Sequence, residues 1–213
     1  RKKEEVMLMV NAKNELEDKI DNIKTAVNEA RANNDRDRLI QLTSEIVLIS
    51  KKLKLIKNDL SQALYDATKD GCVEIVRLLI DHGVNTEYQD NNGYSFLYWA
   101  IEKNNIVMVR FLLEHKANIN TQSNKGHSPL HAAIVGNQPE IVKLLLKYKA
   151  DINAQNIDGL TALHYAVDND LEMFELLIKN GADIESQSNK GNSPLHWAIM
   201  YNKPEIVKLL LNH

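Results

Sequence analysis

A repeat period of about 33 residues is the feature that most restricts what this chain can fold into. Gly93, Gly126 and Gly159 are evenly spaced, and Gly191 follows at a spacing that is shorter by one position. Two segments are near-copies of each other, QSNKGHSPLHAAI from Gln122 and QSNKGNSPLHWAI from Gln187, and each is followed shortly by PEIVKLLL. Self-similarity at such a period indicates a stack of short structural repeats, each packed on its neighbours.

The repeated motifs resemble those of ankyrin repeats, whose signature is a turn glycine, Thr-Pro-Leu-His-x-Ala, a leucine-rich second helix and a closing Gly-Ala-Asp-x-Asn. The matching segments are SPLHAA (128–133), TALHYA (161–166) and SPLHWA (193–198), with closing segments at 117–120, 150–153 and 181–185. The resemblance implies an all-α solenoid of five repeats. Their approximate bounds are 58–90, 91–123, 124–156, 157–188 and an incomplete 189–213. The first repeat is degenerate, because Tyr65 stands where the family has histidine.

The residues of each repeat also favour this fold on local physical grounds. Ser128, Thr161 and Ser193 are good N-caps, and a proline in the first turn costs no hydrogen bond. Lys116 and Lys149 stand where a left-handed glycine is usual, which predicts a strain of up to about 1 kcal/mol. The fourth repeat is one residue short between Ala166 and Met173, and we expect the loop between its helices to absorb the loss.

Residues 1–57 form a different regime, with neither glycine nor proline and a net charge of +3, against −6 for the remainder. Apolar residues recur in steps of three and four, first from Val6 to Ala30 if Lys13 fills one slot, and then from Leu39 to Leu60 without a defect. Two such seams separated by the turn-prone residues 33–35 predict an antiparallel, coiled-coil-like helical hairpin. An intermolecular coiled coil is the alternative. The lysines at 51–57 are interpreted as a solvated helix face rather than an anion site.

No turn signal separates the hairpin from the first repeat, so we expect one unbroken helix from about Asp35 to Lys69. The hairpin (1–57) is then fused to the solenoid (58–213) as its N-terminal cap, which covers an apolar end. At the other end, residues 209–211 are all leucine with no polar capping repeat. We therefore expect either further repeats or an adhesive surface there, and the missing initiator methionine predicts a piece of a longer protein.

Catalysis finds no support in the sequence. His131, His164 and His196 recur with the period, but stacked helices stand about 8–10 Å apart, too far for one metal ion. The resemblance implies instead that each bonds within its own turn. Cys72 has no nucleophile motif around it, and there is no phosphate loop. We expect no enzyme activity, no metal and no cofactor.

A protein partner is the ligand that the resemblance implies, bound through the turn tips and the first helix of each repeat. Large apolar groups in turns, such as Ile157 and Leu160, either contact the partner or pack between neighbouring turns; this choice stays open. The expected contact residues are Tyr94, Glu102, Lys103, Lys125, His127, Ile157, Asp158, Leu160, Asp168, Lys190, Asn192, Met200 and Tyr201.

The sequence therefore predicts a protein–protein interaction module. The alternatives are a scaffold that self-associates as a homo-oligomer through residues 1–57, or the targeting arm of a larger protein with catalysis elsewhere. The small net charge of −3 argues against nucleic-acid binding, and no apolar run is long enough to span a membrane. The single cysteine favours a reducing, cytoplasmic location. The high asparagine content is compatible with an effector secreted into a host cytosol.

Overall fold

The computed structural model describes residues 2–33 and 35–213, except for the side chains of Arg36 and Leu39. Every regular element in these ranges is a helix, so the predicted all-α class is confirmed there. The chain forms two compact units, residues 1–85 (unit 1) and 86–213 (unit 2). The helices are α1 Lys2–Ala32, α2 Arg36–Lys69, α3 Val73–Asp81, α4 Phe96–Glu102, α5 Ile106–Glu114, α6 Pro129–Val135, α7 Pro139–Lys147, α8 Ala162–Ala166, α9 Leu171–Lys179, α10 Pro194–Met200 and α11 Pro204–Leu211.

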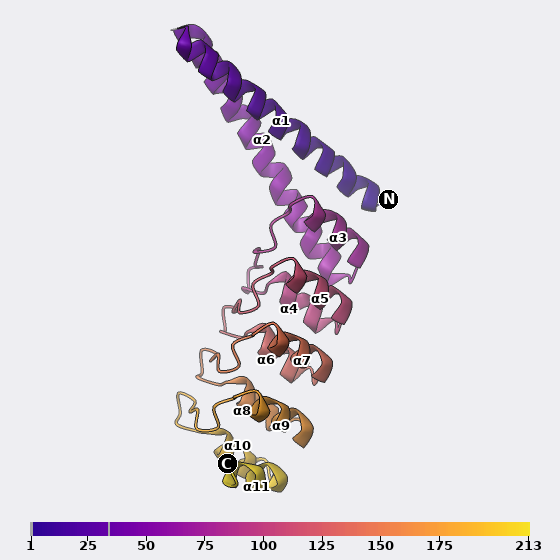
Figure 1. The fold of residues 1–213 in the computed structure, drawn as a ribbon, viewed down its shortest axis with the longest axis vertical. Helices are drawn as coiled ribbons and strands as arrows, with labels where there is room; N and C mark the ends of the chain where they lie inside the picture. The colour runs from indigo at the N-terminus through magenta and orange to yellow at the C-terminus, as the bar shows by residue number, and fades with distance from the viewer. Residues whose placement is uncertain (1, 34) are drawn as a thin grey trace. The chain divides into compact units, whose positions relative to one another are not determined.

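The two long helices of unit 1, α1 and α2, run antiparallel (Figure 1). Asp35 begins α2, because its carboxylate accepts a hydrogen bond from the backbone N–H of Arg38 at 3.1 Å. Lys57 of α2 pairs with Glu17 of α1 at 2.9 Å. The predicted turn includes Asn34, and the predicted second seam begins with the side chain of Leu39. Both lie outside what the structure describes.

The unbroken helix expected from about Asp35 to Lys69 is present as α2. The predicted division at residue 57 therefore falls inside a continuous helix, since no glycine or proline interrupts residues 36–69. The last turns of α2 and the short α3 form a helix pair. α1 packs on both, with Val6 and Val10 only 5% and 0% exposed, and Lys13 donates to the carbonyl oxygen of His82 at 3.3 Å.

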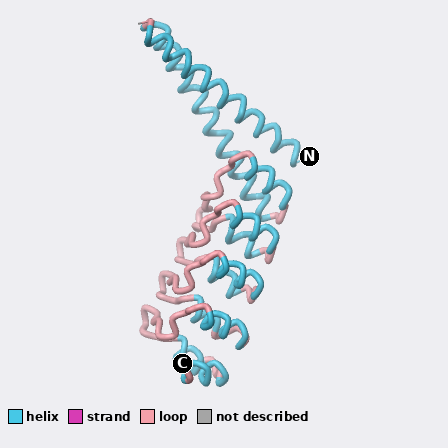
Figure 2. Tube along the Cα trace, in the orientation of Figure 1, coloured by secondary structure: helices cyan, strands magenta, loops and turns pink. Residues whose placement is uncertain are grey.

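Unit 2 consists of four helix pairs that follow one another in chain order: α4 and α5, α6 and α7, α8 and α9, α10 and α11 (Figure 1). The first helices α4, α6, α8 and α10 contact one another in series, and their apolar faces supply much of the core. Leu97, Leu130 and Leu163, each at the same place in its own pair, are at most 1% exposed. The long loops that join one pair to the next extend from the same side of unit 2 (Figure 2).

The missing residue of the fourth repeat lies where the sequence predicted, between α8 and α9. The expectation that the loop absorbs the loss was wrong, because the helix is shortened instead. α8 has five residues, whereas the other first helices have seven. The linkers of the other three pairs each hold one asparagine at positive φ, namely Asn104, Asn137 and Asn202. Residues 167–170, all described, include no such position, so the deletion removes the left-handed turn residue and shortens α8.

Candidate functional site

The loops between the pairs of unit 2 are tied to one another by a ladder of glutamines. We call residues 89–94, 122–127, 155–160 and 187–192 the tip loops. Gln89 donates from Nε2 to the carbonyl oxygen of Gln122 at 3.0 Å, and Gln122 donates in the same way to Gln155 at 3.0 Å. Gln155 continues the ladder to Gln187 at 3.4 Å. Each tip loop is therefore held by the next, and the surface that they form is preorganised.

Glycines let neighbouring tip loops approach this closely. Gly159 has φ +76°, and a Cβ there would lie 2.7 Å from the backbone nitrogen of Asn189 in the next tip loop. Gly126 has φ +73°, with its Cβ position 2.8 Å from backbone atoms of Asn156. Both positions need glycine twice over, for the left-handed backbone and for the space. Gly191 has the same φ of +75° but nothing within 4 Å of its Cβ position.

The recurring histidines join each first helix to a tip loop. The backbone N–H of Ser128 donates to His131 Nδ1 at 3.1 Å, so Nε2 carries the proton and donates to the carbonyl oxygen of Leu160 at 3.1 Å. His164 makes the equivalent bonds to Thr161 and Asn192. Burial lowers the pKa of His131 to about 4 and lowers that of His164 as well. The predicted structural role of these two histidines is confirmed by their bonds.

Three aromatic clusters lie along the first helices and tip loops, and the first is built on α4. The ring of Tyr94 stacks on that of Tyr98 with centroids 3.9 Å apart, and Trp99 meets both rings edge-on. The hydroxyl of Tyr98 donates to the carboxylate of Glu102 at 3.3 Å. Burial is the main cause, and the Glu102 charge the next, of the raised pKa of Tyr98, so this hydroxyl stays a donor.

The second cluster is a hydrogen-bonded group of His127, Asn156 and Tyr165. The side-chain oxygen of Asn156 accepts from the backbone N–H groups of Asp158 and Leu160, both at 2.9 Å, which turns its amide nitrogen toward Tyr165. That nitrogen donates to the Tyr165 hydroxyl oxygen at 2.9 Å. The Tyr165 hydroxyl is then left to donate to His127 Nε2 at 3.1 Å. Burial lowers the pKa of His127, which favours the neutral ring that can accept this hydrogen bond.

The third cluster belongs to α10. The ring of Trp197 meets that of Tyr201 and that of His164 edge-on, each at 5.8 Å between centroids. Tyr201 is 47% exposed and its neighbour Met200 is 63% exposed. The C-terminal end of α10 and its cap residue therefore present a flexible apolar side chain and an aromatic side chain to solvent side by side.

The predicted contact residues occupy the tip loops and the C-terminal ends of the first helices, as expected from the repeat register. Ile157 is 61% exposed at the tip of its loop. Leu160 is half-buried, and its carbonyl oxygen accepts from His131. Half-buried with it are Tyr94, His127 and Asn192; exposed are Glu102, Lys103, Lys125, Ile157, Asp158, Asp168, Lys190, Met200 and Tyr201.

The sequence reasoning missed four aromatic side chains on this surface: Tyr98, Trp99, Tyr165 and Trp197. Trp99, Tyr165 and Trp197 share one position of the repeat, directly after the recurring histidine, whose place Tyr98 takes in the pair of α4 and α5. The motif leaves this position variable. A comparison of the four repeats at that one position would have found them. Val135, one turn further along α6, was also missed, although it is 65% exposed.

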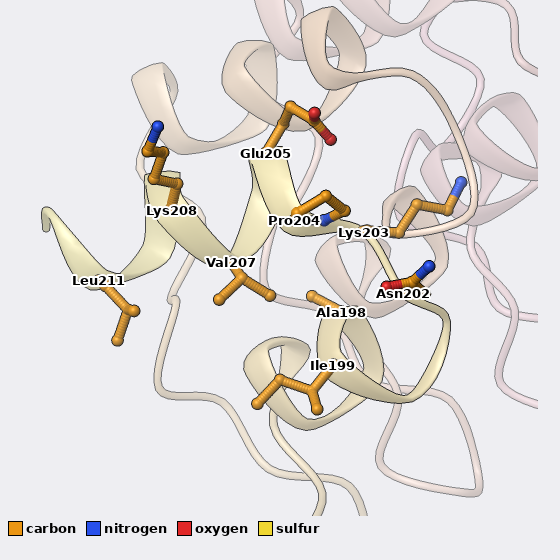
Figure 3. Close-up of a pocket in the computed structure, with 9 residues that line it drawn as sticks. All are labelled: Ala198, Ile199, Asn202, Lys203, Pro204, Glu205, Val207, Lys208 and Leu211. Atoms are coloured by element: carbon orange, nitrogen blue, oxygen red, sulfur yellow. The ribbon is translucent and has the colours of Figure 1, made fainter.

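The last helix pair carries a further apolar surface with a pocket of about 440 Å³ (Figure 3). Ile199 and Leu211, which line it, are 64% and 70% exposed. The residues equivalent to Ile199 in the earlier pairs are 0% exposed, because in each case another pair stacks on them: Ile101, Ile134 and Val167. The expected adhesive end is therefore apolar and accessible in this chain.

Within residues 2–33 and 35–213, no group of three or more histidine, cysteine, aspartate and glutamate side chains is arranged to hold a metal ion. No helix in the same ranges is long and apolar enough to cross a membrane. This surface combines a backbone held by hydrogen bonds with aromatic rings and scattered exposed charges.

Comparison with known proteins gives the following results. A family model described as ankyrin repeats (3 copies) matches the chain over residues 8–123, 64–156 and 130–213. No curated protein sequence matches the chain.

Proposed function

The chain belongs to the ankyrin-repeat family, and on that premise we propose that it binds a partner protein through the tip loops and first helices of unit 2. Ankyrin repeats are generally protein–protein interaction modules without catalytic activity. The observation that carries the proposed binding face is the row of aromatic side chains along it: Tyr94, Tyr98, Trp99, Tyr165, Trp197 and Tyr201.

Aromatic residues suit this role because they dominate the energetics of protein interfaces. A tyrosine or tryptophan adds a large contact area while ordering only two torsions, and it keeps a polar group for a specific bond. Here the rings are held in place before binding, by stacking at Tyr94 and Tyr98 and by hydrogen bonds at Tyr165. Binding a partner therefore costs little side-chain entropy, which favours affinity.

Exposed charges of both signs surround the rings and supply the means of choosing a partner. Glu102, Asp158 and Asp168 are acidic, whereas Lys125 and Lys190 are basic, and all five are exposed. Mixed charges at the rim of an interface act mainly on association rate and on the rejection of wrong partners. We infer a protein partner with a matching, mixed charge pattern rather than a strongly charged polymer.

We assign five repeats to the chain, the first formed by the end of α2 with α3 and the other four by the pairs of unit 2. The hairpin of α1 and α2 serves as the cap of the first repeat, because Val6 and Val10 of α1 are buried in unit 1. The single cysteine, Cys72, fits a reducing compartment such as a cytosol, of the cell itself or of a host. We propose no reaction chemistry for the ankyrin repeats themselves.

The experiment is capture of partners from a cell lysate with the immobilised 213-residue chain, identified by mass spectrometry. The test variant is the double substitution Ile157→Asp with Met200→Asp, because both side chains are more than 60% exposed and their loss leaves the core intact. The matched control is Val107→Asp, since Val107 is 54% exposed on α5, a second helix. We expect captured proteins to be lost at least tenfold with the double variant and kept with the control.

Thermal unfolding of all three chains checks that the changes act on binding alone. A midpoint within about 2 °C of the parent is expected for each variant, because exposed substitutions seldom change stability by more than about 0.5 kcal/mol. The proposal is refuted if captured proteins remain bound to the double variant but are lost from the Val107→Asp chain. That result would place the binding face on the second helices.

A further inference from the structure

The helix α2 has a second apolar stripe, on the face turned away from α1. The seam of α2 toward α1 is buried, with Ile49, Leu53 and Leu60 at 8%, 9% and 1% exposed. Four other large apolar side chains are exposed by half or more: Ile40 at 62%, Val47 at 50%, Leu48 at 57% and Leu55 at 64%. A solvated helix face is normally polar, so this stripe calls for a partner.

The four residues lie together on one face by helix geometry. At about 100° per residue, they fall within a sector of about 100°, which is centred about 170° from the centre of the buried seam. They also span about 23 Å of helix at 1.5 Å per residue. A stripe of this width and length matches what a second helix covers in a coiled coil.

The spacing of the stripe is symmetric about a point between Val47 and Leu48. Ile40 lies as far before that point as Leu55 lies after it. An antiparallel copy of α2 placed with a two-fold axis at this point sets Ile40 against Leu55 of the second copy, and Val47 against Leu48. Two-fold interfaces are self-complementary in this way: when one residue contacts a second residue of the other copy, the same contact occurs again with the two copies exchanged.

The charges beside the stripe are self-complementary under the same axis. Glu45 and Lys52 are both exposed and lie on the same flank of the stripe, about 20° apart around the helix. In an antiparallel pair, residues of one flank meet the same flank of the partner helix. Glu45 of one copy therefore lies within about two residues of Lys52 of the other, in reach of its long side chain, and the pairing occurs twice.

Lys51 lies within the stripe, and its position indicates what kind of surface covers the stripe. In the two-fold arrangement Lys51 lies opposite Ser44 of the second copy, where its ammonium reaches solvent past a small polar side chain. A single lysine inside an apolar seam is a known device for fixing register between helices. A flat lipid surface offers Glu45 no counter-charge.

We propose that the outer face of α2, formed by Ile40, Val47, Leu48 and Leu55, binds the same face of a second copy of this chain in an antiparallel two-fold dimer. The dimer is a four-helix assembly of two hairpins and carries two copies of unit 2. Two binding units on one particle raise the avidity for a partner with repeated or clustered sites. This self-association is independent of which face of unit 2 binds the partner.

Sedimentation equilibrium of the 213-residue chain over about 1 µM to 1 mM tests the proposal. We expect a reversible monomer–dimer equilibrium. Leu48→Glu should raise the dimer dissociation constant at least twentyfold, because two acidic groups then face the axis. Leu8→Glu is the matched control, since Leu8 is 69% exposed on α1 outside the stripe, and it should change the constant less than twofold. Helix content by circular dichroism should be equal in all three chains.

Charge reversal tests the antiparallel register. Glu45→Lys and Lys52→Glu alone should each raise the dissociation constant about fivefold, and the two together should restore it to within about twofold. A chain that is monomeric at every concentration overturns the proposal, and so does a dimer that Leu48→Glu leaves intact. A monomer that binds vesicles with anionic lipid through this stripe also overturns it, in favour of a membrane surface. A double reversal that fails to restore the dimer overturns the antiparallel register.

Discussion

Acidification should destabilise unit 2 through His131, a buried histidine of the tip-loop network whose pKa lies well below its ordinary value. The side chain is 1% exposed, and both ring nitrogens are engaged, Nδ1 by the Ser128 N–H and Nε2 by the Leu160 carbonyl oxygen. A second proton must enter at Nδ1, where an N–H group already points. Burial therefore holds the pKa at about 4, whereas the unfolded chain has the ordinary value of 6.5.

The magnitude and sign follow from the difference between these two pKa values. Below pH 6.5 the unfolded chain takes up a proton at this residue while the folded chain does not, so the free energy of unfolding falls as the pH falls. At about 1.4 kcal/mol per pH unit, the loss reaches about 3 kcal/mol by pH 4 and then levels off. That is a large share of the roughly 5–15 kcal/mol that stabilises a typical domain.

Urea unfolding between pH 7.5 and pH 4 measures this effect when the parent is compared with His131→Gln. The parent should be more stable at pH 7, and its advantage should shrink by about 3 kcal/mol at pH 4. A His131→Gln difference that does not change with pH would refute the argument.

Four further substitutions probe the tip loops and turns, each by urea unfolding. Gly159→Ala should cost about 3 kcal/mol because its Cβ meets the next tip loop, whereas Gly191→Ala should cost only about 1 kcal/mol for the backbone; equal costs would remove the close-approach argument. Lys149→Gly should add about 0.5–1 kcal/mol by relieving a φ of +64°, and an unchanged or lower stability would contradict the strain. Tyr165→Phe should cost about 1–2 kcal/mol because buried Asn156 loses its shorter hydrogen bond and keeps only His127 Nε2 at 3.3 Å, and a neutral result would show that this contact or water replaces the hydroxyl.

Local features of the fold were predictable because local chemistry decides them. Ser128 caps α6 and Asp35 caps α2 with side chains that reach only three residues along the chain. Lys116 and Lys149 adopt the left-handed backbone that their place in the period predicted. The continuity of α2 was predictable because no helix-breaking residue interrupts it, and the repeat period predicted the stack of helix pairs.

The candidate binding surface was predicted less completely, because exposure depends on partners far away in the sequence. Ile157 and Leu160 were equivalent candidates, yet Ile157 is exposed at its tip while Leu160 is half-buried beside the bond that its carbonyl accepts from His131. The aromatic clusters were overlooked because Trp99, Tyr165 and Trp197 occupy a motif position that no local rule marks as functional.

The sequence by itself determined the helices, their caps and their period, since backbone torsions and first-turn hydrogen bonds are set by residues a few places apart. Only the tertiary structure decided which residues at equivalent positions of the repeats are buried. Ile134 and Ile199 occupy the same position in their pairs, and one is 0% exposed while the other is 64% exposed, because a following pair packs on the first alone. The same reason separates Gly159 from Gly191, and the buried seam of α2 from its exposed outer stripe: burial is set by what packs against a residue from elsewhere in the chain.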